Sequence, residues 1–290
     1  MPLLMKNFRT LHLRRLRRRF LPRMWRQFLS KLNSFNNQNG QFLKLRYTEF
    51  PRSMATVYFR TLEYLPPPLD STSEQPALFD GTTRLYMTYT CPFAQRVWIT
   101  RNYKGLQHKI KLVPLNLQNK PAWYKEKVYP ENKVPALEHD GKIIGDSLVL
   151  IKYVNGNFEG PSLLPNDPDK RKLYEELLSD MDKFTGMMFT TFKGDSTTGA
   201  GAAFDHLEHA LTKYDGPFFL GDEFSLADIA YITLVERFQI YLSEAFNYDI
   251  TAGRPKLAAW IEAANKIDAY KQTKKTDPNE LVALYKMFTA

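Results

Sequence analysis

The chain has 290 residues, 43% of them hydrophobic and 24% charged, which is enough to bury a large core. Its net charge of +9 is uneven, because residues 1–53 hold 13 Lys and Arg residues and one acid, Glu49. The rest holds 27 basic and 30 acidic residues. A nucleic-acid-binding protein needs a basic surface on its folded part, so this distribution argues against a nucleic-acid partner.

Residues 1–60 form a basic N-terminal extension that is typical of an organellar transit peptide. Met54 begins the sequence MATVYF, which resembles a second start site. We therefore expect a plastid protein if translation starts at Met1 and a cytoplasmic one if it starts at Met54. A solvated basic tail, 5′ sequence that is not translated, and a nuclear or RNA-binding arm in RRLRRR are the alternatives.

No segment reaches the ~18 to 20 uncharged apolar residues of a membrane span, so no stable membrane insertion is expected. The chain has one cysteine, Cys91, which excludes an intrachain disulfide and fits a reducing compartment. Any redox chemistry at Cys91 therefore needs a thiol from outside the chain. His206 and His209 share a helix face, but no carboxylate at ligand spacing completes a site, so no metal is expected.

The first folded half alternates short strands and helices. Its expected elements are a strand Arg84–Tyr89, a helix Phe93–Lys104, a strand Lys109–Leu115, a short helix Pro121–Val128, strands Pro135–Glu138 and Lys142–Ile144, and a helix to about Val154. Asp140-Gly141 predicts a hairpin turn, and Asp146 or Ser147 caps the last helix. The order βαβαββα with mixed pairing predicts a thioredoxin-like α/β domain over residues 80–158, with order beginning near Thr82.

Residues 160–168 contain three prolines and are predicted to form a linker. The sequence beyond them has helical periodicity, which predicts an all-α domain over residues 168–288. The expected helices are Asp169–Lys183, Gly201–Tyr214, one that begins after Ser225, and Pro255–Ile267. The spacing of Ser225 and Asp228 is that of a capping box, so we interpret Asp228 as structural.

Cys91 lies between a predicted strand and a helix that Pro92 begins. Unpaired amides and the positive end of the helix dipole favour the thiolate there and can lower a cysteine pKa to roughly 3.5–7.5. The structural alternative is a small, inert buried side chain. Arg96, one turn along the helix, adds positive potential or forms a surface ion pair, and we favour the ion pair.

Cys91-Pro92-Phe93-Ala94 matches the glutaredoxin active-site motif, with Ala94 where dithiol enzymes have a second cysteine. The run Leu85–Ile99 (LYMTYTCPFAQRVWI) resembles the cysteine-containing glutathione transferases, namely the omega class, the dehydroascorbate reductases and the lambda class of plants. The lambda class is the nearest of these, and the resemblance covers about residues 60–290. It implies a glutathione-transferase fold, with glutathione as co-substrate and a monomeric state.

The resemblance also implies a glutathione site. Asn132-Lys133-Val134-Pro135 resembles the family's cis-proline loop, where Lys133, Val134 and Pro135 contact glutathione and the Val134 backbone pairs with its cysteinyl part. Asp146-Ser147 resembles the acid–serine pair that holds the γ-glutamyl end, with Asp in place of the usual Glu. Lys120 matches a lysine near the glycine carboxylate, and Phe93 packs beside the thiol. The alternatives are ordinary helix caps and a solvated loop lysine.

This site predicts a thioltransferase that removes glutathione from small aromatic or flavonoid-type adducts through a mixed disulfide at Cys91. A dehydroascorbate reductase and a carrier that binds flavonoids or glutathione without turnover are the alternatives. A non-enzymatic relative such as the chloride intracellular channel proteins is a further alternative, but Arg96, Arg101 and Lys104 disfavour the membrane insertion that is ascribed to the first helix of that family. Four apolar residues line the acceptor pocket or belong to the core: Met187, Met188, Phe189 and Phe192.

Overall fold

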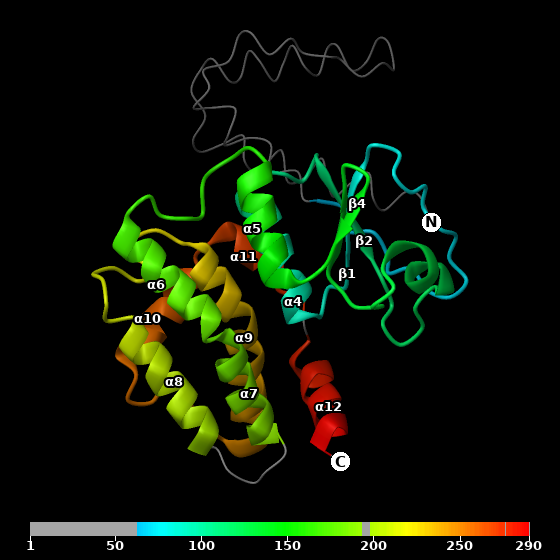
Figure 1. Ribbon diagram of the computed structural model, residues 1–290. Coiled ribbons are helices and arrows are strands. Elements are labelled where there is room, and N and C mark those ends of the chain that lie inside the picture. Colours follow the sequence, from blue (N-terminus) through cyan, green and yellow to red (C-terminus); the bar gives the residue numbers. More distant parts are fainter. Residues whose placement is uncertain (1–62, 193–197, 276, 290) are drawn as a thin grey trace, which may run out of the picture. The chain divides into compact units, whose positions relative to one another are not determined.

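The computed structural model describes residues 63–192, 198–275 and 277–289, which belong to one compact unit. Its first half holds a four-stranded sheet in the order β2-β1-β3-β4 (Figure 1). The strands are β1 (Thr83–Met87), β2 (Ile110–Pro114), β3 (Ala136–His139) and β4 (Lys142–Ile144). β1 is parallel to β2 and antiparallel to β3, which is antiparallel to β4. The predicted mixed α/β sheet is confirmed.

The two faces of the sheet are covered by different helices, because successive side chains of a strand point to opposite faces. Leu85 and Met87 of β1 are fully buried in the main core, which also includes apolar residues of α4 (Pro92–Tyr103). Tyr86, between them, faces a second cluster with Tyr124, and their ring centroids are 5.5 Å apart. The short helix predicted around Tyr124 is a π-helical turn, Tyr124–Val128.

The ordered part of the chain begins before Thr82, the predicted start. Leu69 forms a parallel bridge with Leu115, donating its N–H to the carbonyl of Pro114 at 2.8 Å. The N–H of Asn116 donates in turn to the carbonyl of Leu69 at 2.8 Å. The prediction that order starts near Thr82 is wrong, because the open edge of β2 binds this proline-rich segment.

Local signals account for the turn and the cap that shape the sheet. Asp140 and Gly141 join β3 to β4 with φ values of 47° and 72°, as the hairpin prediction requires. α5 (Ser147–Asn157) begins after Asp146, whose carboxylate accepts the backbone N–H groups of Leu148 and Val149 at 2.9 Å each. Asp146 is therefore the N-cap, and Ser147 is the first helical residue.

The regular elements described in the second half are helices, as predicted, apart from an isolated bridge between Phe218 and Gly221. Its helices are α6 (Pro168–Ser179), α7 (Met181–Phe192), α8 (Thr198–Ala210), α9 (Leu226–Phe246), α10 (Pro255–Ala264), α11 (Asp268–Lys271) and α12 (Pro278–Thr289). The prediction of a single helix over Asp169–Lys183 is wrong, because α6 ends at Ser179 and a separate helix, α7, begins at Met181. α11 and α12 were not among the expected helices.

The central helix of the fold is α4, which packs against α5, α9 and α11 (Figure 1). Every residue from Ala94 to Asn102 is buried, so α4 has no solvent-exposed face along that stretch. Cys91 immediately precedes this helix and is thereby held between the sheet and the helical half. No helix in the described part of the chain is long and apolar enough to cross a membrane.

Candidate active site around Cys91

Cys91 is the N-cap of α4, and its carbonyl accepts the N–H of Gln95 at 3.0 Å. Pro92 occupies the first helical position, where its missing N–H costs no hydrogen bond. The thiol is unpaired and partly exposed to solvent, and it contacts the main core. The predicted placement of a single thiol at a helix N-terminus is therefore what the structure shows.

The expectation that the helix N-terminus lowers the pKa of Cys91 is wrong for the ligand-free chain. Burial raises the pKa of the Cys91 thiol above its usual value. The backbone N–H groups of Ala94 and Phe93 and the positive charges of Arg237 and Arg96 lower this pKa, but their combined effect is smaller than that of burial. Sequence reasoning identified the helix N-terminus and could not identify the burial of Cys91, which depends on packing against the main core.

This balance predicts the pH dependence of Cys91 alkylation in the ligand-free protein. The thiolate is the reactive species, so a raised pKa lowers the reactive fraction at neutral pH. We expect the rate with iodoacetamide to keep rising as the pH passes about 8.5, the value of a free cysteine. Since the chain has one cysteine, mass spectrometry of the intact protein follows this thiol alone. A rate that reaches its plateau below pH 7 would contradict the prediction.

Arg96 is not the surface residue that we favoured. Its side chain is 2% exposed, and its Nη1 donates to the Ser147 hydroxyl at 3.0 Å. Its Nε donates to the Ala230 carbonyl at 2.9 Å, and Nη2 lies 3.2 Å from the sulfur of Met181. The guanidinium also lies 5.1 Å from the ring centroid of Phe93. Arg96 therefore connects the cysteine helix to Ser147, one of the predicted glutathione ligands.

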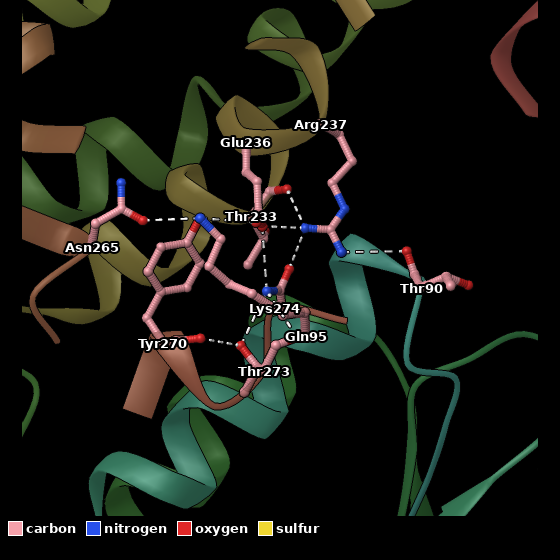
Figure 2. Close-up of polar contacts among 9 residues, drawn as sticks. All are labelled: Thr90, Gln95, Thr233, Glu236, Arg237, Asn265, Tyr270, Thr273 and Lys274. Atoms are coloured by element: carbon pink, nitrogen blue, oxygen red, sulfur yellow. Dashed lines mark hydrogen bonds and ion pairs between the residues drawn. The ribbon is translucent and has the colours of Figure 1, made fainter. Parts of the chain in front are cut away.

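A second buried arginine contacts the residue before Cys91. Arg237 of α9 donates through Nη2 to the carbonyl of Thr90 at 3.4 Å and through Nη1 to Gln95 at 2.6 Å (Figure 2). Its Nη1 is also paired with the carboxylate of Glu236, and Gln95 donates to the Thr273 hydroxyl at 3.0 Å. This network connects α9 and Thr273 of the helical half to α4 and to Thr90, the residue before Cys91.

The predicted cis-proline loop adjoins the same end of the sheet. The Val134–Pro135 peptide bond is cis, as the resemblance implies. Pro135 precedes β3, whose first residue pairs with Tyr86 near the end of β1 that leads to Cys91. Lys120 donates through Nζ to the carbonyl of Asn132 at 2.6 Å, which connects the predicted lysine to this loop. These contacts bring Lys120 and the loop together.

The remaining predicted ligands differ in exposure. Lys133 is exposed and pairs with Glu131 at 3.2 Å. Asp146 is exposed and has a φ of 64°, in a region that non-glycine residues rarely adopt. Ser147 is 7% exposed and lies one residue further, beside Arg96. The capping and ligand interpretations of Asp146 remain compatible, because one carboxylate has several acceptor positions.

Two further sequence interpretations have a place in the structure. Met188 is buried in the core and Met187 is partly buried against it, while the side chains of Phe189 and Phe192 lie outside the described part of the structure. His206 is half exposed, with its Nε2 3.5 Å from Asp180. In the described ranges no group of three or more His, Cys, Asp or Glu residues could hold a metal ion.

The structural class is that of a two-part glutathione transferase, and comparison with known proteins agrees. Family models for the glutathione S-transferase N-terminal and C-terminal domains match residues 85–162 and 196–263. Glutathione transferase Omega 2C from Trametes versicolor superimposes with a TM-score of 0.61 at 28% identity, over 72% of this chain and 99% of that chain.

Relatives from plants are considerably more similar in sequence. Glutathione S-transferase L3 of Arabidopsis thaliana is 63% identical over 229 residues, which cover 79% of this chain and 97% of the relative. Glutathione S-transferase L2, chloroplastic, of the same plant is 58% identical and covers 76% of this chain and 75% of the relative. The chain therefore belongs to the glutathione transferase family of enzymes, within its lambda class.

Sequence reasoning favoured the wrong role for Arg96, a surface ion pair, and did not identify Arg237. One signal was present for Arg96, because its neighbours Ala94, Val97, Trp98 and Ile99 are apolar on all sides of one helical turn. A helix without a polar face is buried, so an arginine within it needs an internal role. No comparable signal identifies Arg237, which depends on the packing of α9 against α4.

Proposed function

We propose that this protein is a glutathione-dependent thioltransferase that removes glutathione from small-molecule adducts through a mixed disulfide at Cys91. The observation that supports it best is the single unpaired thiol at the N-terminus of α4, between two buried arginines. Ala94 stands where a resolving cysteine would be needed for a dithiol cycle. The second thiol therefore comes from glutathione.

The proposed cycle has two displacement steps. The Cys91 thiolate attacks the glutathione sulfur of the adduct, and the electron pair of the broken bond leaves with the acceptor, which takes up a proton. Cys91 then carries glutathione as a mixed disulfide. The thiolate of a second glutathione attacks the glutathione sulfur of this disulfide, which releases oxidised glutathione and regenerates the Cys91 thiolate. Two glutathione sulfurs are oxidised and one acceptor is reduced.

A raised pKa is compatible with this chemistry. A thiolate becomes more nucleophilic as its pKa rises, which offsets part of the loss in thiolate fraction. Cysteine is also nucleophilic enough to react when only a few per cent is ionised. A neutral thiol reacts slowly with oxidants in solution, whereas a bound adduct presents its sulfur at close range. We therefore expect reactivity to depend on binding.

In the proposed complex the glutathione lies between the cis-proline loop and the start of α5. The Val134 backbone pairs with its cysteinyl part beside Lys133 and Pro135, and Lys120 approaches its glycine carboxylate. Ser147, through its hydroxyl and its backbone N–H, binds the γ-glutamyl carboxylate, and Asp146 faces the γ-glutamyl ammonium. Phe93 packs beside the sulfur. A small aromatic or flavonoid-type molecule is the proposed acceptor.

The intact protein provides the test. After incubation with oxidised glutathione, we expect mass spectrometry to show one glutathione per chain, located on Cys91 by peptide mapping. Addition of reduced glutathione should remove this adduct completely and release oxidised glutathione. An adduct that forms but is not removed by excess glutathione would contradict the proposed cycle, because its second step would then fail.

Two other functions share the site. Dehydroascorbate reduction uses the same thiol, and the ratio of turnover on dehydroascorbate to turnover on a glutathionylated flavonoid separates the two enzymes. The raised pKa of Cys91 favours a carrier that binds these molecules without turnover, because such a thiol is less reactive. A carrier would bind the flavonoid equally well after alkylation of Cys91 and would show no turnover before it.

We further propose a monomer, located in plastids when translation starts at Met1 and in the cytoplasm when it starts at Met54. One relative, glutathione S-transferase L2, is described as chloroplastic. The segment concerned, residues 1–62, lies outside the described ranges. Fluorescent fusions beginning at each methionine would test the compartments in leaf cells, and light scattering during gel filtration would measure the oligomeric state.

A further inference from the structure

Arg96 is a buried cation whose hydrogen bonds within the described part of the chain all go to uncharged acceptors. These acceptors are a backbone carbonyl, a hydroxyl and a thioether, contributed by Ala230, Ser147 and Met181. No described carboxylate lies within ion-pair distance of its guanidinium. A buried charge without a counter-ion is costly, so a fold that keeps one generally uses it.

The other buried arginine of the same helix shows the ordinary solution. Arg101 is also almost fully buried, and its guanidinium pairs with the carboxylate of Glu63 at 2.5 Å. It also donates to the carbonyl of Ile110 at 2.7 Å. Arg101 is thus neutralised within the chain, five residues further from Cys91, whereas Arg96 is not. The difference between these two arginines is the observation to be explained.

The hydroxyl of Ser147 connects Arg96 to the start of α5. Because this oxygen accepts a hydrogen bond from Arg96, its own hydrogen is available to donate to another group. Ser147 is also the first residue of α5, where the positive end of the helix dipole favours an anion, although Asp146 already accepts the N–H groups of Leu148 and Val149. Arg96 therefore polarises a donor at a place that already attracts negative charge.

The charged and titratable groups around Arg96 come from every helix that packs on it. Burial lowers the pKa of Arg96 to about 10, so its guanidinium stays protonated at neutral pH. Four groups oppose this lowering, and they belong to the Cys91 loop, the cap of α5, α9 and α7: Cys91, Asp146, Tyr231 and Asp182. The thiol is the first of these, so Arg96 acts on Cys91 and on the start of α5 together.

We propose that Arg96 is the internal counter-charge of the glutathione site, a positioning residue that acts through Ser147 on the γ-glutamyl carboxylate and at longer range on the Cys91 thiolate. This inference rests on the proposed function and deepens it. In the ligand-free chain no described carboxylate forms an ion pair with the guanidinium, and Asp146 and Asp182 act on it only at longer range. When glutathione binds, its carboxylate and the ionised thiol supply the negative charge.

The first test is a double-mutant-type cycle, in which Arg96 of the protein and the carboxylate of the ligand are changed separately and together. Binding of S-methylglutathione, which cannot form a disulfide, is compared by calorimetry with binding of its analogue whose γ-glutamyl carboxylate is a primary amide. We expect the wild type to bind the amide at least about tenfold more weakly, as for a lost charge-assisted hydrogen bond. Arg96→Met should reduce this ratio below about threefold, and Arg96→Lys should retain part of it.

Arg101→Met is the matched control, because it removes a buried arginine from the same helix. It should lower stability and leave the carboxylate ratio at the wild-type value. The second readout is Cys91 alkylation at pH 7, which should slow about three- to tenfold in Arg96→Met and stay unchanged in Arg101→Met, from the loss of one nearby charge.

An unchanged carboxylate ratio in Arg96→Met, with S-methylglutathione still bound, would overturn the Arg96 proposal and leave the proposed function standing. Absence of S-methylglutathione binding in the folded wild type would overturn both. If Arg96→Met does not fold, Ser147→Ala removes the connection while keeping the arginine. It should reduce the carboxylate ratio to the same extent, and an unchanged ratio there would equally overturn the proposal.

Discussion

Replacing Cys91 with serine should lower the rate of glutathione-dependent reduction of hydroxyethyl disulfide about a thousandfold or more. The proposed cycle passes through a covalent bond to this sulfur, and a hydroxyl neither ionises at neutral pH nor forms a mixed disulfide. No other thiol in the chain can substitute for it, because Cys91 is the only cysteine. Exchange of this one sulfur for oxygen thus tests the whole covalent mechanism.

The serine variant is also its own control for folding and binding. Serine is close to cysteine in size and is a good N-cap, so α4 should still begin at Pro92. We expect thermal unfolding and S-methylglutathione affinity to stay near the wild-type values. Turnover that persists at more than about a tenth of the wild-type rate would contradict covalent catalysis. Absence of turnover in both proteins, with the ligand still bound, would favour the carrier.

Local signals predicted those parts of the fold that local chemistry determines. Pro92 begins α4, Asp140-Gly141 turns the hairpin, and Asp146 caps α5, each by an interaction within a few residues. The β1 and β2 strands followed from their β-forming residues. For the same reason Cys91 could be placed at a helix N-terminus before any tertiary contact was known.

Properties that depend on distant segments could not be predicted in this way. The neighbours of Arg96 come from α5, α7 and α9, and those of Arg237 come from both halves of the chain. The pKa of Cys91 is raised instead of lowered because the effect of burial outweighs that of the helix N-terminus. The relevant quantity in each case is desolvation, which no short sequence window contains.

Asp228 is one long-range feature whose structural role the sequence did indicate, and its loss should be among the most destabilising single changes. It is 0% exposed, and its carboxylate accepts four hydrogen bonds. Their donors are the N–H of Phe219 at 3.1 Å, the N–H and hydroxyl of Ser225 at 2.9 and 2.6 Å, and Nε1 of Trp260 at 2.8 Å. These contacts join the start of α9 to the preceding loop and to α10.

We expect Asp228→Ala to lower the free energy of unfolding by about 3–5 kcal/mol, because several buried donors then lose their acceptor. The matched control is Asp167→Ala. Asp167 is the exposed N-cap of α6 and accepts the N–H of Lys170 at 2.9 Å, so its loss should cost only about 0.5–2 kcal/mol. Both residues are capping aspartates, and burial is what distinguishes them.

Urea unfolding followed by circular dichroism measures both variants, and equal slopes show that they unfold to similarly exposed states. Asp228→Asn refines the argument, since it keeps the shape of the side chain but turns one acceptor into a donor that faces the donors around it. It should lie between the alanine variant and the wild type. If Asp228→Ala lost no more stability than Asp167→Ala, the buried carboxylate would be no more than an ordinary cap. The joint between α9 and α10 would then have to be held by apolar packing around Trp260, which Trp260→Phe would test directly.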